Sequence, residues 1–498
     1  RDAQESRGLG DVYKRQDRVG EGRRIRLPLA KRTSYPKTVR WWPVCVYLPW
    51  DRETSRTLSV LLSFAVSQVV VCRYFGGHGC GPGARRWGMG MRRGTNLPRM
   101  GDFNQSVILE AIRRSGEGLS RIELVEATGL SAQTITNITR RLLDEGLIAE
   151  AGRTINGPGK PRVTLRLVAE SRFSVGVHLD PAVITFVLLN MTGEAVGRRV
   201  VRTQDRDPSR IVETMAKTIE ILIDEAGIDR DLVAGVGVAA PGPLDAAKGT
   251  VIDPPKLDGW HRVPLRSVLA EATGFEVTLE KDTTAAAVGE LWTGDATSEG
   301  SFLFVYLGTG LGAAAARDGG VVAGSTHNFG EIGHIMVDPE GPPCACGSRG
   351  CVEVVCTPQA IVEQAEAAGV FDDEPQGGGA NEVDERFLRL CERASAGELP
   401  ALGVLRRSAG HLAVLISVLT NVLDVDRVVL GGPFWGPLSD VYLREIPEPL
   451  HRRSATRAVR TLTVDGAVVG DDVGAVGAAC VVLDAVLTPR ASDLYLED

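Results

Sequence analysis

Apolar positions recur with a helical period along three consecutive stretches that begin at Asn104. The first stretch places four apolar side chains on one face: Val107, Ile108, Ala111 and Ile112. The second runs from residues 119–120 to Gly129, and the third runs from Ser131 to Glu145. Serine commonly caps the start of a helix and glycine its end, so the pattern predicts three short helices. A basic Gly/Pro turn at residues 157–162 and an alternating stretch at residues 163–167 then predict a hairpin.

From Phe173 the pattern changes to short apolar runs separated by glycine turns. Residues 174–180, 184–189 and 196–201 are typical of an antiparallel strand meander. Residues 211–226 have the period of a helix, and residues 235–240 form another apolar strand pattern. This alternation predicts an α/β body after the small helical module.

The third predicted helix presents a short, polar and partly basic face. Ser131 caps it, and its outward positions are Gln133, Thr134, Asn137, Arg140 and Arg141. Such side chains can reach base edges and phosphates in the major groove of DNA. The hairpin would add a wing whose phosphate contacts come from Arg153, Lys160 and Arg162. A three-helix bundle that binds proteins would show the same core period, and the basic wing favours the α+β winged helix-turn-helix.

Charge divides the chain unevenly. The 498 residues carry a net charge of −7, but residues 1–100 hold 20 Lys+Arg against 7 Asp+Glu. That segment shows no sustained period, and we leave it unassigned. It is interpreted either as disordered or as translated from sequence upstream of a natural start at Met89, Met91 or Met100. Its apolar run, residues 58–72, is shorter than the about 20 residues that cross a bilayer, so no membrane association is expected.

Cysteine usage indicates a reducing compartment. Three of the nine cysteines cluster with a histidine, and the others show no paired spacing, so the cytoplasm is the expected location. The cluster is His334, Cys344, Cys346 and Cys351, an imidazole and three thiolates that suit tetrahedral Zn²⁺. The intervening prolines and glycines exclude a helix or strand, although reduced core cysteines remain the alternative. Glu331 and Glu353 lie at the ends of this loop, and paired acceptors suit a polyhydroxylated ligand.

Glu331-Ile-Gly-His334, followed by Cys344-x-Cys-Gly-x-x-Gly-Cys-x-Glu353, resembles the signature of the ROK family of repressors, open reading frames and sugar kinases. The resemblance implies an actin-like ATPase (ribonuclease H-like) fold with lobes at residues 172–293 and 294–489, whose C-terminal helix can return to the first lobe. It also implies that Glu331, His334 and Glu353 contact a sugar. The segment at residues 101–168 resembles the winged helix-turn-helix of ROK repressors, which the kinases lack.

The nucleotide positions depart from the pattern of ROK kinases. The first turn normally carries Asp-x-Gly-Gly-Thr, where this chain has Asp180-Pro181 and no glycine. Proline supplies no N–H and the other side chains hinder close approach, so the phosphate cradle is degraded. The remaining glycine turns are interpreted as vestigial nucleotide positions kept for architecture: Gly308, Thr309, Gly310, Gly312, Gly431 and Gly432.

Asp282 matches the general-base position of ROK kinases, and Lys281 replaces the usual asparagine before it. We expect both residues to contact the sugar, with Asp282 vestigial as a base. The alternative is a purely structural role, in which Asp282 only caps the helix that follows it.

Together these features predict a non-catalytic, sugar-responsive transcriptional regulator, expected to be a repressor. The implied partners are a double-stranded DNA operator, a sugar or sugar phosphate, and a second copy in a homodimer or dimer of dimers; the implied cofactor is Zn²⁺. The alternative is an ATP-dependent sugar kinase with a fused DNA-binding domain, which Asp282 favours and Pro181 opposes. A DNA binder that senses a protein partner instead would leave Glu331 and Glu353 unexplained.

Overall fold

The computed structural model describes residues 97–487 apart from residues 155–161, 182, 203–205, 256, 258, 295–300 and 374–381. All of the described residues belong to one compact unit. The predictions for residues 1–96, for Lys160 and for the side chain of Arg153 lie outside the described part of the chain.

The N-terminal module has the predicted helices followed by a hairpin. It contains α2 (Leu97–Arg114), β1 (Leu119–Ser120), α3 (Arg121–Thr128), α4 (Ala132–Asp144), β2 (Ile148–Thr154) and β3 (Arg162–Leu167). A capping box of Ser120 and Glu123 starts α3, and Gly129 ends it at φ 69°. Ser131 caps α4 as predicted. The strands form an antiparallel sheet in the order β1-β3-β2. The first helix begins at Leu97, before both its apolar pattern and the expected domain boundary at residue 101.

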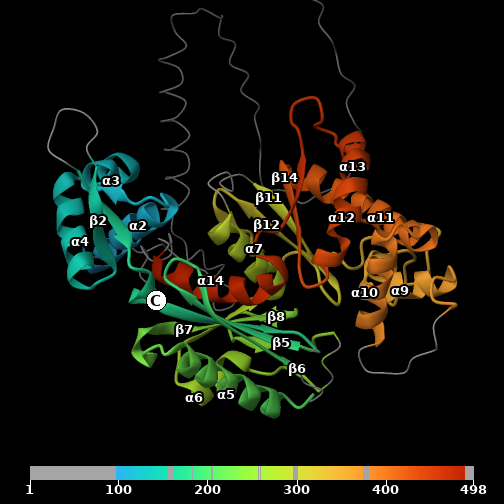
Figure 1. Ribbon diagram of the computed structural model, residues 1–498, viewed down its shortest axis with the longest axis horizontal. Helices are drawn as coiled ribbons and strands as arrows, with labels where there is room; N and C mark the ends of the chain where they lie inside the picture. The colour runs from blue at the N-terminus through green and yellow to red at the C-terminus, as the bar shows by residue number, and fades with distance from the viewer. Residues whose placement is uncertain are drawn as a thin grey trace, which may run out of the picture. The chain divides into compact units, whose positions relative to one another are not determined.

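The first large sheet has the strand order β10-β7-β4-β5-β6. Its strands are β4 (Phe173–Leu179), β5 (Val183–Asn190), β6 (Ala195–Arg202), β7 (Val233–Ala240) and β10 (Val277–Lys281). The first three form the predicted antiparallel meander, and β7 and β10 continue the sheet in parallel with β4. Helices α5 (Pro208–Ala226) and α6 (Leu265–Thr273) lie on one face of this sheet (Figure 1). Side chains of both helices share one buried apolar cluster with the sheet. The short strands β8 (Leu244–Asp245) and β9 (Thr250–Val251) form a separate ribbon.

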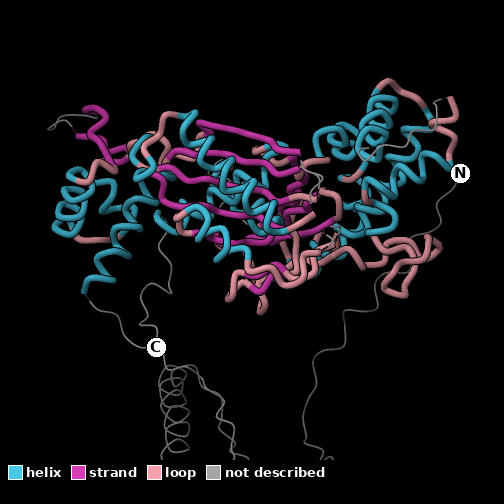
Figure 2. Tube along the Cα trace, turned by 90° about the horizontal axis from the view of Figure 1, so that it is seen from below, coloured by secondary structure: helices cyan, strands magenta, loops and turns pink. Residues whose placement is uncertain are grey.

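The second large sheet has the order β13-β12-β11-β14-β15. Its strands are β11 (Phe302–Leu307), β12 (Leu311–Arg317), β13 (Gly320–Val321), β14 (Arg427–Gly431) and β15 (Thr463–Gly466). Its helices are α8 (Glu353–Cys356), α9 (Pro358–Ala367), α10 (Glu382–Ser395), α11 (Leu399–Leu423), α12 (Trp435–Glu445) and α13 (Pro447–Arg453). The stretch from β13 to α8 contains no helix or longer strand. Figure 2 draws loops and turns of this kind in pink, beside the strands and helices.

Helices α7 (Asp282–Thr293) and α14 (Val473–Leu487) pack directly against each other. A Cβ on Gly477 of α14 would lie 1.9 Å from the carbonyl oxygen of Ala285 in α7. Helix α14 packs equally closely on two glycines of the first sheet. A Cβ on Gly176 or Gly237 would lie 1.9 Å from an α14 carbonyl oxygen. The C-terminal helix therefore returns to the first sheet, as Figure 1 shows.

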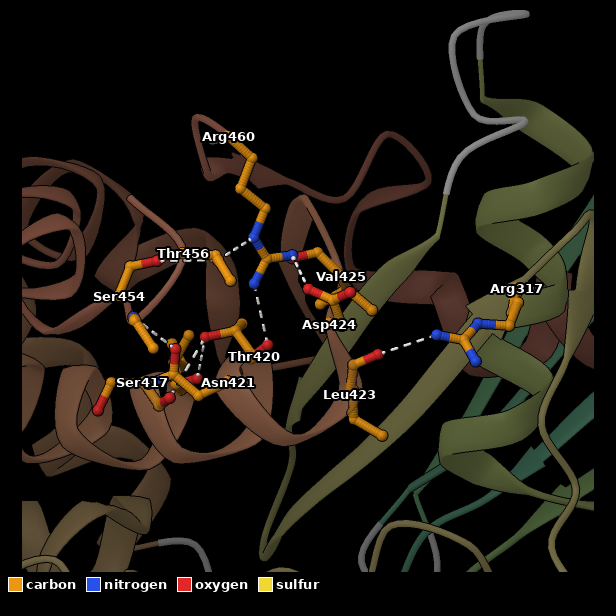
Figure 3. A network of polar contacts seen from close by, with 12 residues as sticks. Arg317, Ser417, Thr420, Asn421, Leu423, Asp424, Val425, Ser454, Thr456 and Arg460 are labelled. Carbon is orange, nitrogen blue, oxygen red and sulfur yellow. Dashed lines mark hydrogen bonds and ion pairs between the residues drawn. The ribbon is translucent and has the colours of Figure 1, made fainter. Parts of the chain in front are cut away.

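Helix α11 is long and apolar enough to span a membrane, although half of its apolar window is buried within the protein. Its buried side chains join the core cluster of the second sheet. Two arginines satisfy carbonyl groups at its C-terminal end (Figure 3). Arg460 donates to Thr420 O at 3.1 Å, and Arg317 donates to Leu423 O at 3.1 Å. Positive charges also interact favourably with the partial negative charge at the C-terminal end of a helix. These contacts therefore fit a core helix of a folded domain.

Two glycine-to-alanine changes test whether the α7–α14 contact depends on a missing side chain. Gly477→Ala should lower the free energy of unfolding by about 1–3 kcal/mol or more, since overpacking forces the helices apart. Gly403→Ala, within α11, is the matched control because nothing lies within 4 Å of its Cβ position. Alanine there should stabilise the protein by about 0.5–1 kcal/mol. Urea unfolding followed by circular dichroism measures both, and equal effects would contradict this account.

Candidate functional site

The N-terminal end of α7 brings three predicted ligand residues together. Lys281 ends β10 with a side chain only 4% exposed, and its Nζ lies 2.6 Å from Glu331 Oε1. The same ammonium donates to Phe329 O at 3.2 Å. Glu331 is 63% exposed at its side chain, so the buried cation holds a carboxylate that still faces solvent. Gly242 makes room for this pair, since its Cβ would lie 3.0 Å from Glu331 Oε1.

Asp282, the next residue, is partly buried at the start of α7. Its Oδ1 accepts the N–H of Thr283 at 2.7 Å, and within the described residues Oδ2 accepts no hydrogen bond. Burial raises the pKa of this carboxyl, whereas the nearby His178 and Lys281 act in the opposite direction. One oxygen is therefore used within the helix, and the other can accept a hydrogen bond from a ligand hydroxyl.

His178 and Tyr306 form a buried polar contact next to Asp282. His178 Nε2 lies 3.2 Å from the Tyr306 hydroxyl, which joins β4 to β11. Burial raises the pKa of the Tyr306 hydroxyl well above its usual value. The negative charges of Asp282 and Asp180 raise it further. Neither residue is among the site residues predicted from the sequence. The signal in the sequence was a histidine inside a mainly apolar strand, which the structure buries along its whole length.

The glycine turns are explained by close packing around this pair. A Cβ on Gly308 would lie 2.8 Å from the Tyr306 ring, and one on Gly312 would lie 2.4 Å from the methyl group of Thr283. Gly432 has a φ of 113°, and its Cβ would lie 2.6 Å from Leu307 O. A Cβ on Gly431 would lie 2.6 Å from the Phe304 ring. These contacts require glycine without any nucleotide, and Thr309 and Gly310 complete the partly exposed β11–β12 turn.

The four predicted metal ligands converge in the loop before α8. The ligand atoms of His334, Cys344, Cys346 and Cys351 all lie within 4.8 Å of one another. Cys344 Sγ is 3.4 Å from His334 Nδ1, and Cys346 Sγ is 3.6 Å from Cys351 Sγ. These separations suit tetrahedral coordination, in which thiolates about 2.3 Å from a metal are roughly 3.8 Å apart. The group could therefore hold a metal ion.

The backbone of this loop depends on glycines at its sharp turns. Gly350 has a φ of 57°, and its Cβ would lie 1.6 Å from Asp338 O. A hydrogen bond from the Ser348 backbone lowers the pKa of Cys346 to about 7, which favours the thiolate that metals bind. Glu353 starts α8, where its N–H donates to Gly333 O at 2.9 Å. Its Oε2 lies 3.2 Å from the Cβ position of Gly333 and 3.9 Å from that of Gly310, so this carboxylate adjoins the β11–β12 turn.

The outer face of α4 presents Gln133, Asn137 and Arg140 at helical spacing, and all three are exposed. Gln133 Nε2 donates to Asn137 Oδ1 at 3.0 Å. Among the described residues, the Arg140 side chain has neither a hydrogen-bond partner nor an ion-pair partner, which leaves its cation accessible.

Within the described residues, the other predicted DNA contacts already have partners in the protein. Ser131 Oγ accepts the N–H of the half-buried Thr134 as the helix cap. Arg141 donates to Gln105 and lies 3.9 Å from Glu145. Arg162 lies 3.6 Å from Glu123.

The comparisons with known proteins agree with this architecture. The ROK family profile matches residues 174–485, and a MarR family profile matches residues 96–153. A putative xylose repressor from Caldicellulosiruptor sp. (strain Rt8B.4) is 26% identical over 77% of this chain and 96% of its own length. A glucokinase from Halalkalibacterium halodurans is 28% identical over 61% of this chain and 93% of its own length.

Solved structures show the same fold. A crystal structure described as a ROK family transcriptional regulator, homologous to the E. coli MLC protein, covers 78% of this chain and 97% of its own. It is 23% identical with a TM-score of 0.65. A ROK family glucokinase from Streptomyces griseus, solved with glucose and AMPPNP, covers 62% of this chain and 98% of its own, at 26% identity and a TM-score of 0.54. The ROK profile spans more than half of the sequence, and the chain therefore belongs to the ROK family.

Proposed function

We propose that this chain is a sugar-responsive transcriptional regulator that represses by binding double-stranded DNA. One observation carries the proposal: a winged helix-turn-helix with an exposed polar α4 face precedes a ROK body with converging sugar-type ligands. Two Caldicellulosiruptor relatives, one named a putative xylose repressor and one a xylose repressor, cover 77% and 78% of this chain, whereas the glucokinase from Halalkalibacterium halodurans covers 61%. Two recognition helices of a homodimer would occupy half-sites about 34–36 Å apart.

The sugar site is proposed to lie at the N-terminal end of α7. Asp282 Oδ2 and the exposed carboxylate of Glu331 would accept hydrogen bonds from sugar hydroxyls. The ion pair with Lys281 would hold the Glu331 carboxylate in place. Glu353 and His334 would complete the site from the loop before α8, as the family resemblance implies. Carboxylates outnumber ammonium groups here, and this balance favours a neutral sugar over a sugar phosphate.

Zn²⁺ is the metal proposed for the cysteine cluster, because three thiolates and one imidazole form a closed tetrahedral set. All four protein ligands would be used, so the metal would have a structural role. It would hold Glu331 and Glu353, which lie on either side of the cluster in sequence, in a fixed arrangement. No substrate would bind to the metal itself.

ATP-dependent sugar phosphorylation remains the second candidate, since Asp282 is retained at the N-terminal end of α7. The described structure opposes it at the β4–β5 turn, where Pro181 offers no N–H to phosphate. The buried His178–Tyr306 pair also packs closely on two glycines, Gly308 before β12 and Gly474 at the start of α14. Steady turnover of a hexose with ATP and Mg²⁺ by the purified chain would establish the kinase instead.

Arg140→Ala should weaken operator binding at least about tenfold, because a lost base or phosphate contact typically costs about 1–3 kcal/mol. Arg166→Ala is a matched control, since Arg166 is exposed on β3, outside α4, and donates to the Glu117 carbonyl at 2.7 Å. Fluorescence anisotropy with a duplex selected from a random pool by the wild-type chain measures both affinities. A similar loss in the two variants would argue against α4 as the recognition helix.

Cys344→Ser should lower the bound zinc below one ion per chain and weaken sugar binding, because the ligand loop loses a metal bond. Cys356→Ser provides the control, since Cys356 is buried nearby in α8 but lies outside the cluster. Elemental analysis and calorimetric titration with D-xylose and D-glucose give the two readouts. Full zinc content and unchanged sugar affinity in Cys344→Ser would refute the proposed role of the metal.

Asp282→Asn should weaken sugar binding yet raise the free energy of unfolding at pH 7.5. Burial raises the pKa of Asp282, so its folded-state pKa lies above the unfolded value. The stability of the folded protein relative to the unfolded chain therefore falls as the pH rises through the folded-state pKa of Asp282. Asparagine carries no charge at either pH, so the Asp282→Asn protein does not undergo this loss. The advantage of asparagine should shrink as pH falls toward about 4, where the unfolded carboxyl also protonates. Urea unfolding at pH 7.5 and 5 checks the trend, which a pH-independent difference would contradict.

A further inference from the structure

Helix α7 joins the proposed sugar site to the DNA-binding module. Its first residue is Asp282, and Trp292 lies in its last turn, about 15 Å away at 1.5 Å per residue. Trp292 is 8% exposed and contacts Arg113 of α2. The guanidinium carbon lies 4.2 Å from the Trp292 ring, and Arg113 Nη1 donates to the Trp292 carbonyl at 3.3 Å. One end of α7 thus belongs to the ligand site and the other contacts the first helix of the DNA-binding module.

Arg113 is held in a fixed orientation by its own helix. Its Nε and Nη2 donate to the two carboxylate oxygens of Glu110 at 2.8 and 2.9 Å. The Arg113 side chain is 12% exposed and that of Glu110 is 11% exposed. Bidentate pairs of this type restrict the guanidinium plane, and a planar cation over an indole ring has a preferred geometry. A displacement of Trp292 would therefore act on the backbone of α2 through Arg113.

Helix α14 closes the same junction from a second side. Trp292 Nε1 donates to Asp484 Oδ1 of α14 at 3.4 Å. Side chains of all three helices share one buried cluster, in which Ile108, Leu109 and Ile112 of α2 lie with residues of α14. The Cβ position of Gly289 in α7 is only 3.1 Å from Gly477 Cα in α14. Packing this close leaves little free volume, so α7 cannot shift without moving its neighbours.

A buried ion pair ties α7 to the second sheet as well. Glu290 has a fully buried side chain that lies 3.2 Å from Arg427 Nη2 on β14. Its other oxygen accepts the Val468 N–H at 3.1 Å. A change in the separation of the two sheets would therefore act on α7 near Trp292. The position of α7 would therefore depend both on ligand contact at Asp282 and on movement of the two lobes.

We propose that Arg113 and Trp292 are positioning residues that couple the sugar site to the DNA-binding module through α7. The inference rests on the proposed function and specifies how its two sites communicate. A ligand that contacts Lys281 and Asp282 favours one placement of α7 over another. The Arg113–Trp292 contact then favours the corresponding placement of α2, and with it of α4. Neither residue touches the sugar or the DNA in this arrangement.

The test compares operator affinity with and without saturating sugar for four forms of the full chain. The forms are wild type, Arg113→Gln, Trp292→Leu and Arg114→Gln. The probes are D-xylose, D-glucose and a duplex selected from a random pool by the wild-type chain. Arg114→Gln is the matched control because Arg114 also bonds to Glu110, through Nε at 2.5 Å. Calorimetry gives the sugar affinity of each form, and hydrogen exchange reports sugar-induced changes in the α2 amides.

We expect the wild-type operator affinity to change roughly 5–150-fold with sugar, the usual range for coupled sites. Arg113→Gln and Trp292→Leu should reduce that ratio to within about twofold of one. The sugar affinity of both variants should stay within about twofold of wild type. Sugar should no longer change the hydrogen-exchange rates of the α2 amides in these variants. Arg114→Gln should keep the wild-type ratio. If Arg113→Gln does not fold, Trp292→Leu tests the same contact from α7.

Two results would overturn the inference. Wild-type ratios in both Arg113→Gln and Trp292→Leu would show that coupling runs elsewhere, while the proposed function stands. An equal loss in Arg114→Gln would show general damage to α2 rather than a specific contact. Failure of the proposed function is distinguishable, because the wild-type chain itself would then bind no sugar or show no sugar-dependent change in operator affinity.

Discussion

The close contact of α7 with α14, made possible by missing side chains, positions the rest of the protein. Carbonyl oxygens of α14 lie only 1.9 Å from the Cβ positions of Gly176 and Gly237, and the Ala285 carbonyl oxygen of α7 lies equally close to that of Gly477. This packing fixes both ends of α7. Lys281, directly before α7, pairs with Glu331, and Trp292 in the last turn of α7 contacts Arg113 of the DNA-binding module. A bulkier interface would separate elements whose relative placement the proposed function needs.

The polar contacts around α7 suit binding more than phosphoryl transfer. Lys281 is buried against Glu331, and Asp282 bonds to its own helix, so the site is ordered before any ligand arrives. The buried His178–Tyr306 pair joins the two large sheets, and His178 lies near the end of β4, before the turn that contains Pro181. A kinase needs backbone N–H groups aimed at phosphate during closure, whereas a sensor needs two arrangements that a ligand favours unequally. The retained glycines at Gly308 and Gly432 serve packing in either case.

Local sequence signals predicted much of this structure. The helix caps at Ser120 and Gly129, the strand meander and the spacing of the cysteine cluster all depend on neighbours along the chain. Contacts between distant segments could not be found in the same way. His178 and Tyr306 are 128 residues apart, and Arg113 and Trp292 are 179 apart. The partners of Arg141 and Arg162 were also missed, because surface ion pairs leave no periodic pattern.

The central claim is that sugar binding and DNA binding share one conformational equilibrium, and calorimetry tests it from the sugar side. D-xylose and D-glucose are titrated into the wild-type chain alone and into its complex with the selected duplex. Linkage requires DNA to change the sugar affinity by the same factor as sugar changes the DNA affinity. The account predicts unequal sugar dissociation constants in the two titrations for the sugar that binds. Equal constants for a sugar that binds would contradict it.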